Sequence, residues 1–528
     1  MRFLLLSEGG DGTGLALRLK EEGHDARIWI RDTEAEKRCH GLIDTATEYS
    51  FGQCVVADCT GAGPLLDTYR DSGVPTVGGS SFCDKLETDR KYAEEVFKRA
   101  KIQTPKSVRV SSWDDAVKVI KKLANGTAER VVLKPEGHSS GVIPSYVSYD
   151  QEDAIKMLEH FHTLIGGDEI ELVIQEYLEG VAISTEGWFN GKTWVEGMFN
   201  HTCERKQFLN DDLGPSGGCT GNLVWKCSMK DPLVKELLLP LTELLAERMY
   251  RGALDVNAVV NEAGCYALEF TPRLGYDAFP TLLTTLCDFD FGYFLDSLAR
   301  GYECNETLRD GFGAGVRLTI PPWPSEQFHA QERVPIAGLS AADRKWFYPQ
   351  DVQLNAAGEL ESSGGYGILG VVNGHGQSIS GAFADAYRIL TGLRVPSKQY
   401  RVDLAEVCLK DFRELGKVMG DVDGEWIGVD LDGSIAEYHG WSEEIGFPIP
   451  KMVNRVKRWI ADGKEVRILT ARGAVGDERF SQIRKIHDWL NEHVGHPLEI
   501  TASKDPELKM LWDDRATQVE KNEGTKVA

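Results

Sequence analysis

The sequence predicts a chain built from several α/β and α+β units rather than one domain. At 528 residues the chain is too long for a single hydrophobic core, and this length favours about three or four folding units. Both ends alternate short apolar runs with helical patterns, as parallel α/β units do, whereas the middle contains pairs of strands joined by turns. We therefore expect four parts, which span residues 1–105, 106–305, 306–420 and 425–528.

The composition excludes several classes of protein. Hydrophobic residues make up 42% of the chain, which fits a globular protein, and a net charge of -23 argues against direct nucleic-acid binding. No run of 18 apolar residues occurs, and "MRFLLLSEGG" fits a first buried strand better than a signal peptide. The eleven cysteines contain no Cys-x-x-Cys pair, which favours reduced thiols in a cytoplasmic protein and argues against structural zinc.

Residues 1–105 alternate between strand and helix patterns. The expected strands include "RFLLLS", "DARIWIR" and "CVVADCT", and "GLALRLKEEG" and "PLLDTYRDSG" are expected to be helices. A charged helix is expected over Asp84–Ile102. The turn "EGGDGTG" follows the first strand. Such a turn at a helix N-terminus can bind phosphate, but its glycines also suit a plain tight turn, and both interpretations remain open.

Residues 106–305 favour an α+β unit with hairpins. "SSWDDAVKVIKKLA" has the apolar spacing of a helix, and "RVVLKPEGHSSGVIPSYV" indicates a strand, a glycine-bearing loop and a second strand. "AISTEGWFNGKTWVEGMF" and "ALDVNAVVNEAGCYALEFTPR" are expected to be hairpins, the latter with a turn at Asn261–Gly264. "LVKELLLPLTELLAERM" between them is expected to be one long helix.

The last two parts differ from each other in pattern. Residues 306–420 contain short, glycine-bearing strands and a helix at "SGAFADAYRILTG", so we expect a small β-rich domain. "GDVDGE" is the best candidate for a linker. From residue 425 onward, "WIGVDLDGS", "KMVNRVKRWIADG", "EVRILTARG" and "RFSQIRKIHDWLNEHV" alternate strand and helix again, which predicts a separate compact α/β unit.

The central part contains residues suited to holding a magnesium nucleotide. In "ALEFTPRLGYD", Glu269, Thr271 and Arg273 occupy alternate positions, so on an extended chain they point to one side. Together with Asp255 they offer oxygen ligands for Mg²⁺ and a cation for a phosphoryl group. Lys134 ends the strand "VVLK" just before the glycine-bearing loop, where a lysine can hold phosphate oxygens. Taken alone, each feature also fits a solvated side chain or a surface ion pair.

The order of these motifs resembles the ATP-grasp superfamily and, within it, the glycinamide ribonucleotide synthetases, or phosphoribosylamine–glycine ligases. The resemblance covers about residues 1–420 and implies an ATP-grasp fold. Its most specific stretch is "ERKQFLNDDLGPSGGCTG", in which Gly214, Pro215, Gly217, Gly218 and Gly221 keep the family's spacing. "VIQEYLEG" is similar to the family's adenine hinge, and "LEFTPRLG" to its metal-binding strand end.

The resemblance implies roles for particular residues. The expected ATP contacts are Lys91 or its neighbour Arg90, Lys134, Gly137, Ser139, Ser140, Gly141, Glu176 and Leu178. The expected substrate contacts are Lys206, Asp212, Gly214, Pro215, Ser216, Gly217 and Gly218. The metal ligands would be Asp255, Glu269 and Thr271, with Arg273 as the catalytic residue that stabilises the transferring phosphoryl group. The cofactors would be ATP and Mg²⁺ or Mn²⁺.

The sequence also departs from the family's pattern. Thr271 stands where the family has a metal-binding Asn, which puts binding of two metals in doubt. Ala182 replaces the expected ribose-binding acid, for which Glu179 and Glu186 are alternatives. "DGTG" at residues 11–14 replaces the Arg-Glu-His stretch with which the family grips phosphoribosylamine. Because the changes cluster on the substrate side, a ligase acting on a different amine or carboxylate is a serious alternative.

A second set of residues near the C-terminus also suggests phosphate chemistry. Asp430 and Asp432 follow an apolar run two positions apart, and Thr470, Lys504, Asp513 and Asp514 come at or near the ends of later strands. Paired acids with a lysine can bind Mg²⁺ and attack phosphorus, although an Asp-Gly turn with surface charges is the plainer interpretation. Residues 425–528 resemble the haloacid dehalogenase-like phosphohydrolases, which have a Rossmann-like fold.

In that resemblance Asp430 is the nucleophile and Asp432 the general acid/base. Thr470 and Lys504 hold phosphate, and Asp513 and Asp514, with Asp430 and Asp432, bind the metal.

The sequence therefore predicts an ATP-dependent carboxylate–amine ligase acting through an acyl phosphate, fused to a phosphatase. Its partners would be a small carboxylate, an amine and a phosphomonoester, with no membrane. Two alternatives remain: a specialised ligase for another metabolite or nucleotide, and a nucleotide-binding module in which only the phosphatase part is active.

Overall fold

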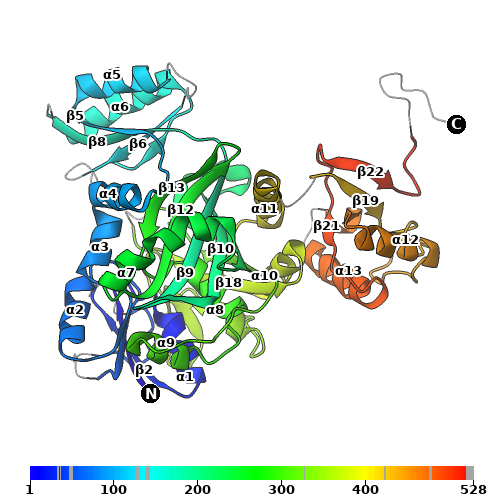
Figure 1. The fold of residues 1–528 in the computed structure, drawn as a ribbon. Helices are drawn as coiled ribbons and strands as arrows, with labels where there is room; N and C mark the ends of the chain where they lie inside the picture. The colour runs from blue at the N-terminus through cyan, green and yellow to red at the C-terminus, as the bar shows by residue number, and fades with distance from the viewer. Residues whose placement is uncertain are drawn as a thin grey trace.

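Figure 1 shows the computed structural model, which describes residues 1–32, 35, 37–46, 51–124, 130–136, 143–167, 169–325, 328–420, 424–474 and 478–518. The N-terminal part is a parallel four-stranded sheet in the order β2-β1-β3-β4, as predicted. Its elements are β1 (Arg2–Ser7), α1 (Thr13–Glu21), β2 (Asp25–Ile30), β3 (Cys54–Ala57), α2 (Gly63–Asp71), β4 (Thr76–Val77), α3 (Ser81–Thr88) and α4 (Arg90–Ala100).

The single helix expected over Asp84–Ile102 is two helices, α3 and α4. Asp89 between them has an extended backbone with φ -110° and ψ 90°, and its carboxylate accepts a hydrogen bond of 3.0 Å from the backbone N–H of Tyr92. A short acidic side chain that caps a helix N-terminus in this way starts a new helix rather than continuing the old one. The break at Asp89 determines which residues stand at the start of α4.

The next unit is an antiparallel sheet of order β5-β8-β6-β7 covered by two helices, which lies at the top of Figure 1. Its elements are β5 (Ser107–Ser112), α5 (Trp113–Ala124), β6 (Val131–Pro135), β7 (Tyr146–Val147), α6 (Gln151–Ile165) and β8 (Glu169–Glu176). The apolar faces of α5 and α6 form a core of their own with this sheet. This unit therefore has its own core, separate from those of the other parts of residues 1–420.

One sheet of eight strands, ordered β13-β12-β9-β10-β11-β14-β18-β15, forms the centre of the molecule. Its strands are β9 (Val181–Asn190), β10 (Trp194–Gln207), β11 (Ser216–Cys227), β12 (Arg251–Asn261), β13 (Gly264–Thr271), β14 (Phe312–Thr319), β15 (Phe347–Pro349) and β18 (Ile368–Gly376). Both predicted hairpins are present. Most strands of the β-rich segment expected at 306–420 belong to this sheet, because β14 pairs with β11 and extends it, and only β16 and β17 form a small sheet of their own.

Shorter elements connect and cover this sheet. They are η3 (Asn210–Asp212), η4 (Val234–Leu238), η5 (Leu239–Leu241), α7 (Thr242–Glu247), α8 (Ala278–Thr285), α9 (Phe291–Arg300), η6 (Arg344–Trp346), β16 (Val352–Leu354), β17 (Leu360–Ser362), α10 (Ile379–Gly392) and α11 (Leu404–Met419). The long helix expected before β12 is broken into η4, η5 and α7. Pro240 lies at the break, where its missing N–H and its ring prevent a regular helix.

The C-terminal unit, orange to red in Figure 1, is the predicted α/β unit with a parallel sheet of order β21-β20-β19-β22. Its elements are β19 (Trp426–Asp430), α12 (Pro450–Ala461), β20 (Glu465–Leu469), η7 (Ala471–Gly473), α13 (Arg479–His493), β21 (Glu499–Thr501) and β22 (Leu508–Trp512). Its core is separate from the cores of residues 1–420 except for Ala384 of α10. Among the described residues, no helix is long and apolar enough to cross a membrane.

The C-terminal unit is docked on α10 through buried polar contacts. The Glu499 carboxylate accepts hydrogen bonds from the backbone N–H groups of Ile379 and Ser380, at 2.7 and 2.9 Å, and so caps α10 from the neighbouring unit. The ring of Phe480 stacks on Tyr387 with centroids 4.0 Å apart. His487 Nε2 lies 3.2 Å from Ser380 Oγ. These contacts hold the two units together across helix α10.

The docking of this unit is expected to weaken in acid because of His487. Burial lowers the pKa of its imidazole to about 4, from the ordinary value of 6.5. The unfolded chain therefore binds the proton more readily, so the histidine's contribution is complete above pH 6.5 and is lost as the pH falls towards 4. We expect a loss of up to about 3 kcal/mol in the free energy of unfolding over this range.

Unfolding by urea between pH 7 and pH 4 measures this loss, with His487→Gln as the comparison. Burial raises the pKa of Glu499, so its contribution has the opposite sign, and the His487→Gln variant separates the two effects. An identical acid dependence in the variant and the parent would contradict the role given to His487.

Candidate active site

Lys134 lies at the junction between the β5–β8 sheet and the central sheet. Its Nζ donates a hydrogen bond of 3.0 Å to Gln175 Oε1 on the neighbouring strand β8. Burial lowers the pKa of the Lys134 ammonium, while the charge of Glu269 acts in the opposite direction. Lys134, Gln175 and Glu269 line a cavity of about 80 Å³ together with apolar residues that include Phe97 and Leu268. The cavity therefore has a cation, a carboxylate and a flat apolar wall.

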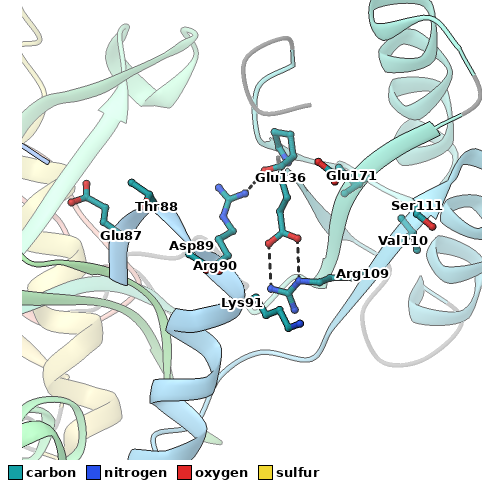
Figure 2. A pocket seen from close by; sticks show the side chains of 12 residues that line it. Glu87, Thr88, Asp89, Arg90, Lys91, Arg109, Val110, Ser111, Glu136 and Glu171 are labelled. Carbon is teal, nitrogen blue, oxygen red and sulfur yellow. Dashed lines mark hydrogen bonds and ion pairs between the residues drawn. The ribbon is translucent and has the colours of Figure 1, made fainter. Parts of the chain in front are cut away.

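A larger cavity of about 640 Å³ opens beside it, between the N-terminus of α4 and the end of β6 (Figure 2). Arg90 donates to the backbone carbonyl of Pro135, and its charge acts on the pKa of Lys134. Lys91 is exposed on the same helix. Of the two cations that the sequence offered, Arg90 is the one held beside Lys134. Sequence alone could not separate them because the break between α3 and α4 was not foreseen.

The opposite wall of this cavity is held by Arg109. Its guanidinium donates to both carboxylate oxygens of Glu136, at 3.0 and 3.2 Å (Figure 2). It also donates to Glu94 at 2.7 Å. These contacts tie β5 to the end of β6 and to α4. The predicted loop residues Gly137, Ser139, Ser140 and Gly141 come just after Glu136 and lie outside the described residues.

The predicted hinge begins within β8, and Glu176 is the last residue of that strand. Glu176 donates its backbone N–H to the carbonyl of Lys106 at 2.9 Å, and its Oε1 accepts from the Lys106 backbone N–H at 2.8 Å. Leu178 is half-buried and Glu179 is exposed. The hinge is thus fixed to the segment before β5.

The predicted metal ligands lie on one face of the edge hairpin β12–β13. Asp255 is directly opposite Thr271 in the antiparallel register, and Glu269 is two residues before Thr271 on the same strand. Ser184 donates a hydrogen bond to one oxygen of Asp255, whereas the other, Oδ1, is buried without a partner. Burial raises the pKa of Asp255 to about 7. Asn257 donates to Thr271 Oγ1 at 3.3 Å.

Glu186 is a carboxylate at this site whose place the sequence did not reveal. It lies directly opposite Asp255 on β9, is 5% exposed and has an unpartnered Oε1. Burial, together with the charge of Asp255, raises its pKa to about 8. Glu186 is therefore a buried neighbour of the predicted metal ligand Asp255. The sequence did not reveal the position of Glu186 because the pairing of β9 with β12 cannot be seen from the sequence.

Arg273 is held at the edge of the cleft by Glu87 of α3. The guanidinium donates to Glu87 Oε1 at 2.9 and 3.2 Å, and its plane lies 3.9 Å from the centre of the Tyr276 ring. Glu87 Oε2 in turn accepts from Thr60 Oγ1 at 2.5 Å. The predicted catalytic arginine is therefore positioned by the N-terminal part, although the two segments are far apart in sequence.

The predicted substrate contacts fall into two groups. Asp212 accepts from Arg205 at 2.9 Å and from Arg401 at 2.5 Å, so its carboxylate is occupied by two arginines in the protein itself. Lys206 is exposed. The remaining predicted contacts lie where the chain enters β11: Gly214 and Pro215 precede the strand, and Ser216, Gly217 and Gly218 are its first residues.

A buried ion pair that the sequence did not reveal supports the start of β11. Arg317 on β14 donates to Asp277 Oδ2 at 2.8 Å and to the carbonyl of Gly217 at 2.8 Å. A side chain on Gly217 would have its Cβ 2.4 Å from the Trp323 ring, so only glycine fits there. The pair therefore holds the start of β11 in place.

In the C-terminal unit, three predicted carboxylates converge at the carboxyl ends of parallel strands. Ligand oxygens of Asp430, Asp513 and Asp514 all lie within 4.8 Å of one another. Burial and the charge of Asp513 raise the pKa of Asp430 to about 7. Such an oxygen-only cluster fits the preference of Mg²⁺.

The other predicted residues of this unit are arranged differently. Both oxygens of Asp432 accept from Arg472, at 2.7 and 3.0 Å, and Arg472 was not foreseen. Thr470 Oγ1 accepts from the Arg472 backbone N–H at 3.2 Å. Lys504 is exposed and lines a cavity of about 380 Å³ against α11, and no contact between described residues joins it to Asp430.

Comparison with known protein families gives independent evidence about the fold of this region. Residues 88–277 match the family model described as "Phosphoribosylglycinamide synthetase, ATP-grasp (A) domain". The central part of this chain has the ATP-grasp fold. The matched residues include Lys134, the predicted hinge, strands β12 and β13, and Arg273, whereas Glu87 and Arg317 lie outside the match.

Two curated relatives and two solved structures agree with this ATP-grasp fold. The phosphoribosylamine–glycine ligases of Halalkalibacterium halodurans and Streptococcus pneumoniae are 24% and 22% identical, each over 78% of this chain and 98% and 100% of their own lengths. The Thermotoga maritima phosphoribosylamine–glycine ligase structure is 20% identical, covers 76% of this chain and 99% of its own, and has a TM-score of 0.60. A Hydrogenobacter thermophilus biotin carboxylase domain solved with MgADP is 14% identical, covers 79% of this chain and 95% of its own, and has a TM-score of 0.51.

These comparisons confirm the predicted ATP-grasp fold, and the named relatives support the prediction of an ATP-dependent carboxylate–amine ligase.

Proposed function

We propose that this chain is an ATP- and Mg²⁺-dependent carboxylate–amine ligase that acts through an acyl phosphate. The observation that carries the proposal is the arrangement around the cleft. Lys134 and Arg90 face it from β6 and α4. The oxygen donors Asp255, Glu269 and Thr271 lie on the facing hairpin. Cations on one side and hard oxygen ligands on the other are what a magnesium–triphosphate complex requires.

Each residue of the site has a separate role in the proposed reaction. Lys134 and Arg90 hold phosphate oxygens, Glu176 and Leu178 position the adenine, and Arg273 neutralises charge on the γ-phosphoryl group. Asp255 and Glu269 are the carboxylates that would hold Mg²⁺, which when bound neutralises the phosphate oxygens. The substrate carboxylate attacks the γ-phosphorus and ADP leaves. The amine then attacks the acyl carbon, and phosphate leaves as the amide bond forms.

Release of ADP and phosphate tests this proposal. The assay uses glycine with phosphoribosylamine, the pair on which the named relatives act, and then a panel of other amines and amino acids. ADP release that requires both a carboxylate and an amine, and that Glu269→Gln abolishes, supports the ligase. Nucleotide binding without ADP release for any pair would instead support a nucleotide-binding module.

Replacement of Arg90 distinguishes the two cations at the start of α4. Arg90→Met is expected to weaken ATP binding about tenfold, because a charge-assisted hydrogen bond to phosphate contributes roughly 1.5 kcal/mol. Lys91→Met is the matched control and is expected to change the affinity less than twofold, since Lys91 is exposed. Calorimetry with a non-hydrolysable ATP analogue measures both affinities. A larger effect for Lys91→Met would reverse the assignment.

We propose a second function, phosphomonoester hydrolysis, for the C-terminal unit. The clustered oxygens of Asp430, Asp513 and Asp514 support a Mg²⁺ site. Asp430 is the proposed nucleophile and Asp432 the general acid/base, oriented by Arg472. Thr470 and Lys504 are the proposed phosphate contacts, although Lys504 would have to turn from the cavity beside α11.

Phosphate release from p-nitrophenyl phosphate in the absence of ATP tests this second function. We expect the activity to require Mg²⁺, to be lost with EDTA, and to fall at least fifty-fold in Asp430→Asn, which lacks the nucleophile. The matched control is Asp462→Asn, an exposed acid at the end of α12. Equal hydrolysis by Asp430→Asn and the parent protein would exclude Asp430 as the nucleophile.

A further inference from the structure

The glycine-rich turn after β1 already has a protein carboxylate at the position where an anion would bind. A turn of this kind at the N-terminus of a helix offers backbone N–H groups to phosphate. Here Asp58, at the end of β3, approaches the turn: Ser7 Oγ donates to its Oδ2 at 2.6 Å, and a Cβ on Gly12 would lie 2.7 Å from the same oxygen. Asp58 is 5% exposed. The position nearest the start of α1 is therefore filled by a negative group.

The N–H groups of the turn are also engaged within the protein. Ser7 Oγ accepts from the Gly10 N–H at 2.9 Å, and the Gly10 carbonyl accepts from the Thr13 N–H at 3.1 Å. The Tyr348 hydroxyl accepts from the Leu15 N–H at 3.1 Å. A Cβ on Gly14 would be 2.5 Å from the Tyr348 ring, so this ring closes the turn from the other side. Few donors remain for a phosphate group.

The charges around the turn leave an excess of carboxylate. Arg38 pairs with Asp351 at 2.7 Å, and Arg317 pairs with Asp277 at 2.5 Å. Asp11 lies within the electrostatic reach of both arginines and both partner acids. No hydrogen bond or ion pair joins its carboxylate to another described residue. Arg38 and Arg317 are thus each paired with another acid, and Asp11 has no ion-pair partner among the described residues.

The carboxylate of Asp58 is a second, independent indication that this turn favours a cation over an anion. Its Oδ1 is buried and has no hydrogen-bond partner. Burial, and then the nearby charge of Asp11, raise the pKa of Asp58 to about 7. A buried carboxylate with an unsatisfied oxygen beside a second carboxylate is an environment that a cation stabilises and an anion destabilises.

We propose that the amine substrate of this ligase carries no phosphate group and carries a second cationic group, which binds against Asp11 at the start of α1. This inference rests on the proposed ligase function and concerns the same site. The curated relatives are named for phosphoribosylamine, a phosphorylated amine. The turn of this chain is built for the opposite charge, so a diamine or a similar dication is the class of amine that fits.

Calorimetry on the full chain loaded with Mg²⁺ and a non-hydrolysable ATP analogue tests the inference. The probes are 1,4-diaminobutane, butylamine and ribose 5-phosphate. We expect diaminobutane to bind, butylamine to bind at least tenfold more weakly, and ribose 5-phosphate to show no binding. Asp11→Asn is expected to reduce the affinity for diaminobutane to that for butylamine. Asp71→Asn, an exposed acid at the end of α2, is the matched control and should change nothing.

Binding of the ATP analogue distinguishes a failure of this inference from a failure of the ligase proposal. Failure to bind the ATP analogue would remove the ligase proposal itself, whereas analogue binding in Asp11→Asn shows that the variant is folded. If the analogue binds, any of three results overturns the inference alone. The first is binding of ribose 5-phosphate. The second is that diaminobutane and butylamine bind equally well or do not bind at all, and the third is that Asp11→Asn keeps the full affinity for diaminobutane.

Discussion

Lys134→Met is expected to lower the rate of ADP formation about a thousandfold, because removal of one preorganised cation or donor from a phosphoryl-transfer site has effects of this order. Lys134 is half-buried between Gln175 and the cavity that Glu269 lines, where the local dielectric is lower than in water and its charge acts more strongly. Methionine keeps most of the side-chain volume, so the loss reports the charge rather than the packing. Initial rates of ADP release at saturating ATP and amine measure it.

Binding of the ATP analogue provides the control for this variant. A thousandfold fall in rate with a change in affinity of less than about tenfold would indicate that Lys134 acts chiefly in the transition state. The exposed Lys106→Met, near the hinge, is expected to keep more than half of the parent rate. A Lys134→Met enzyme that retained more than a tenth of the parent rate would contradict the role given to this lysine.

Arg317→Met is expected to reduce the free energy of unfolding by about 3–5 kcal/mol, the range found when one partner of a buried ion pair is removed. The side chains of Arg317 and Asp277 are 7% and 1% exposed, and Asp277 Oδ1 already lacks a partner. Without the guanidinium, Asp277 would keep a buried charge with no compensation, and the carbonyl of Gly217 would lose its donor. The midpoint of the first urea transition, followed by tryptophan fluorescence, measures the change.

Two further variants show whether the loss of stability comes from the buried, unpaired charge of Asp277. The double variant Arg317→Met/Asp277→Asn removes the stranded charge and should recover at least half of the loss. Arg300→Met breaks a surface pair with Asp296 one helical turn away and should change stability by less than about 0.5 kcal/mol. If Arg317→Met were no more destabilising than Arg300→Met, the buried pair would not hold the start of β11 in place.

The sequence predicted the carboxylates of both sites from motifs at the ends of apolar runs. The structure places Asp255 and Glu269 on the hairpin β12–β13, and Asp430 and Asp513 at the ends of the paired parallel strands β19 and β22. These residues could be selected because each lies beside a short strand pattern that is visible locally in the sequence. The ATP-grasp fold could be predicted for the same reason, since its motifs occur in a fixed order.

The partners that complete the sites could not be predicted in this way. Arg317 reaches Asp277, and Arg472 reaches Asp432, each across 40 residues of sequence. Nothing in the local pattern of an arginine specifies which distant carboxylate it meets, because that depends on strand pairing. The continuation of the central sheet into residues 306–420 escaped prediction for the same reason, since β14 resembles any short glycine-bearing strand until its neighbour is known.

The carboxylate of Glu499 has a consequence for any attempt to study the two halves separately. It occupies the open amide groups at the start of α10, and Phe480 covers the Tyr387 ring of the same helix. A ligase fragment ending near residue 420 would lose this cap and expose an aromatic face to water, which favours self-association. Each half thus covers a surface of the other, and the separated halves are expected to be less stable than the intact chain.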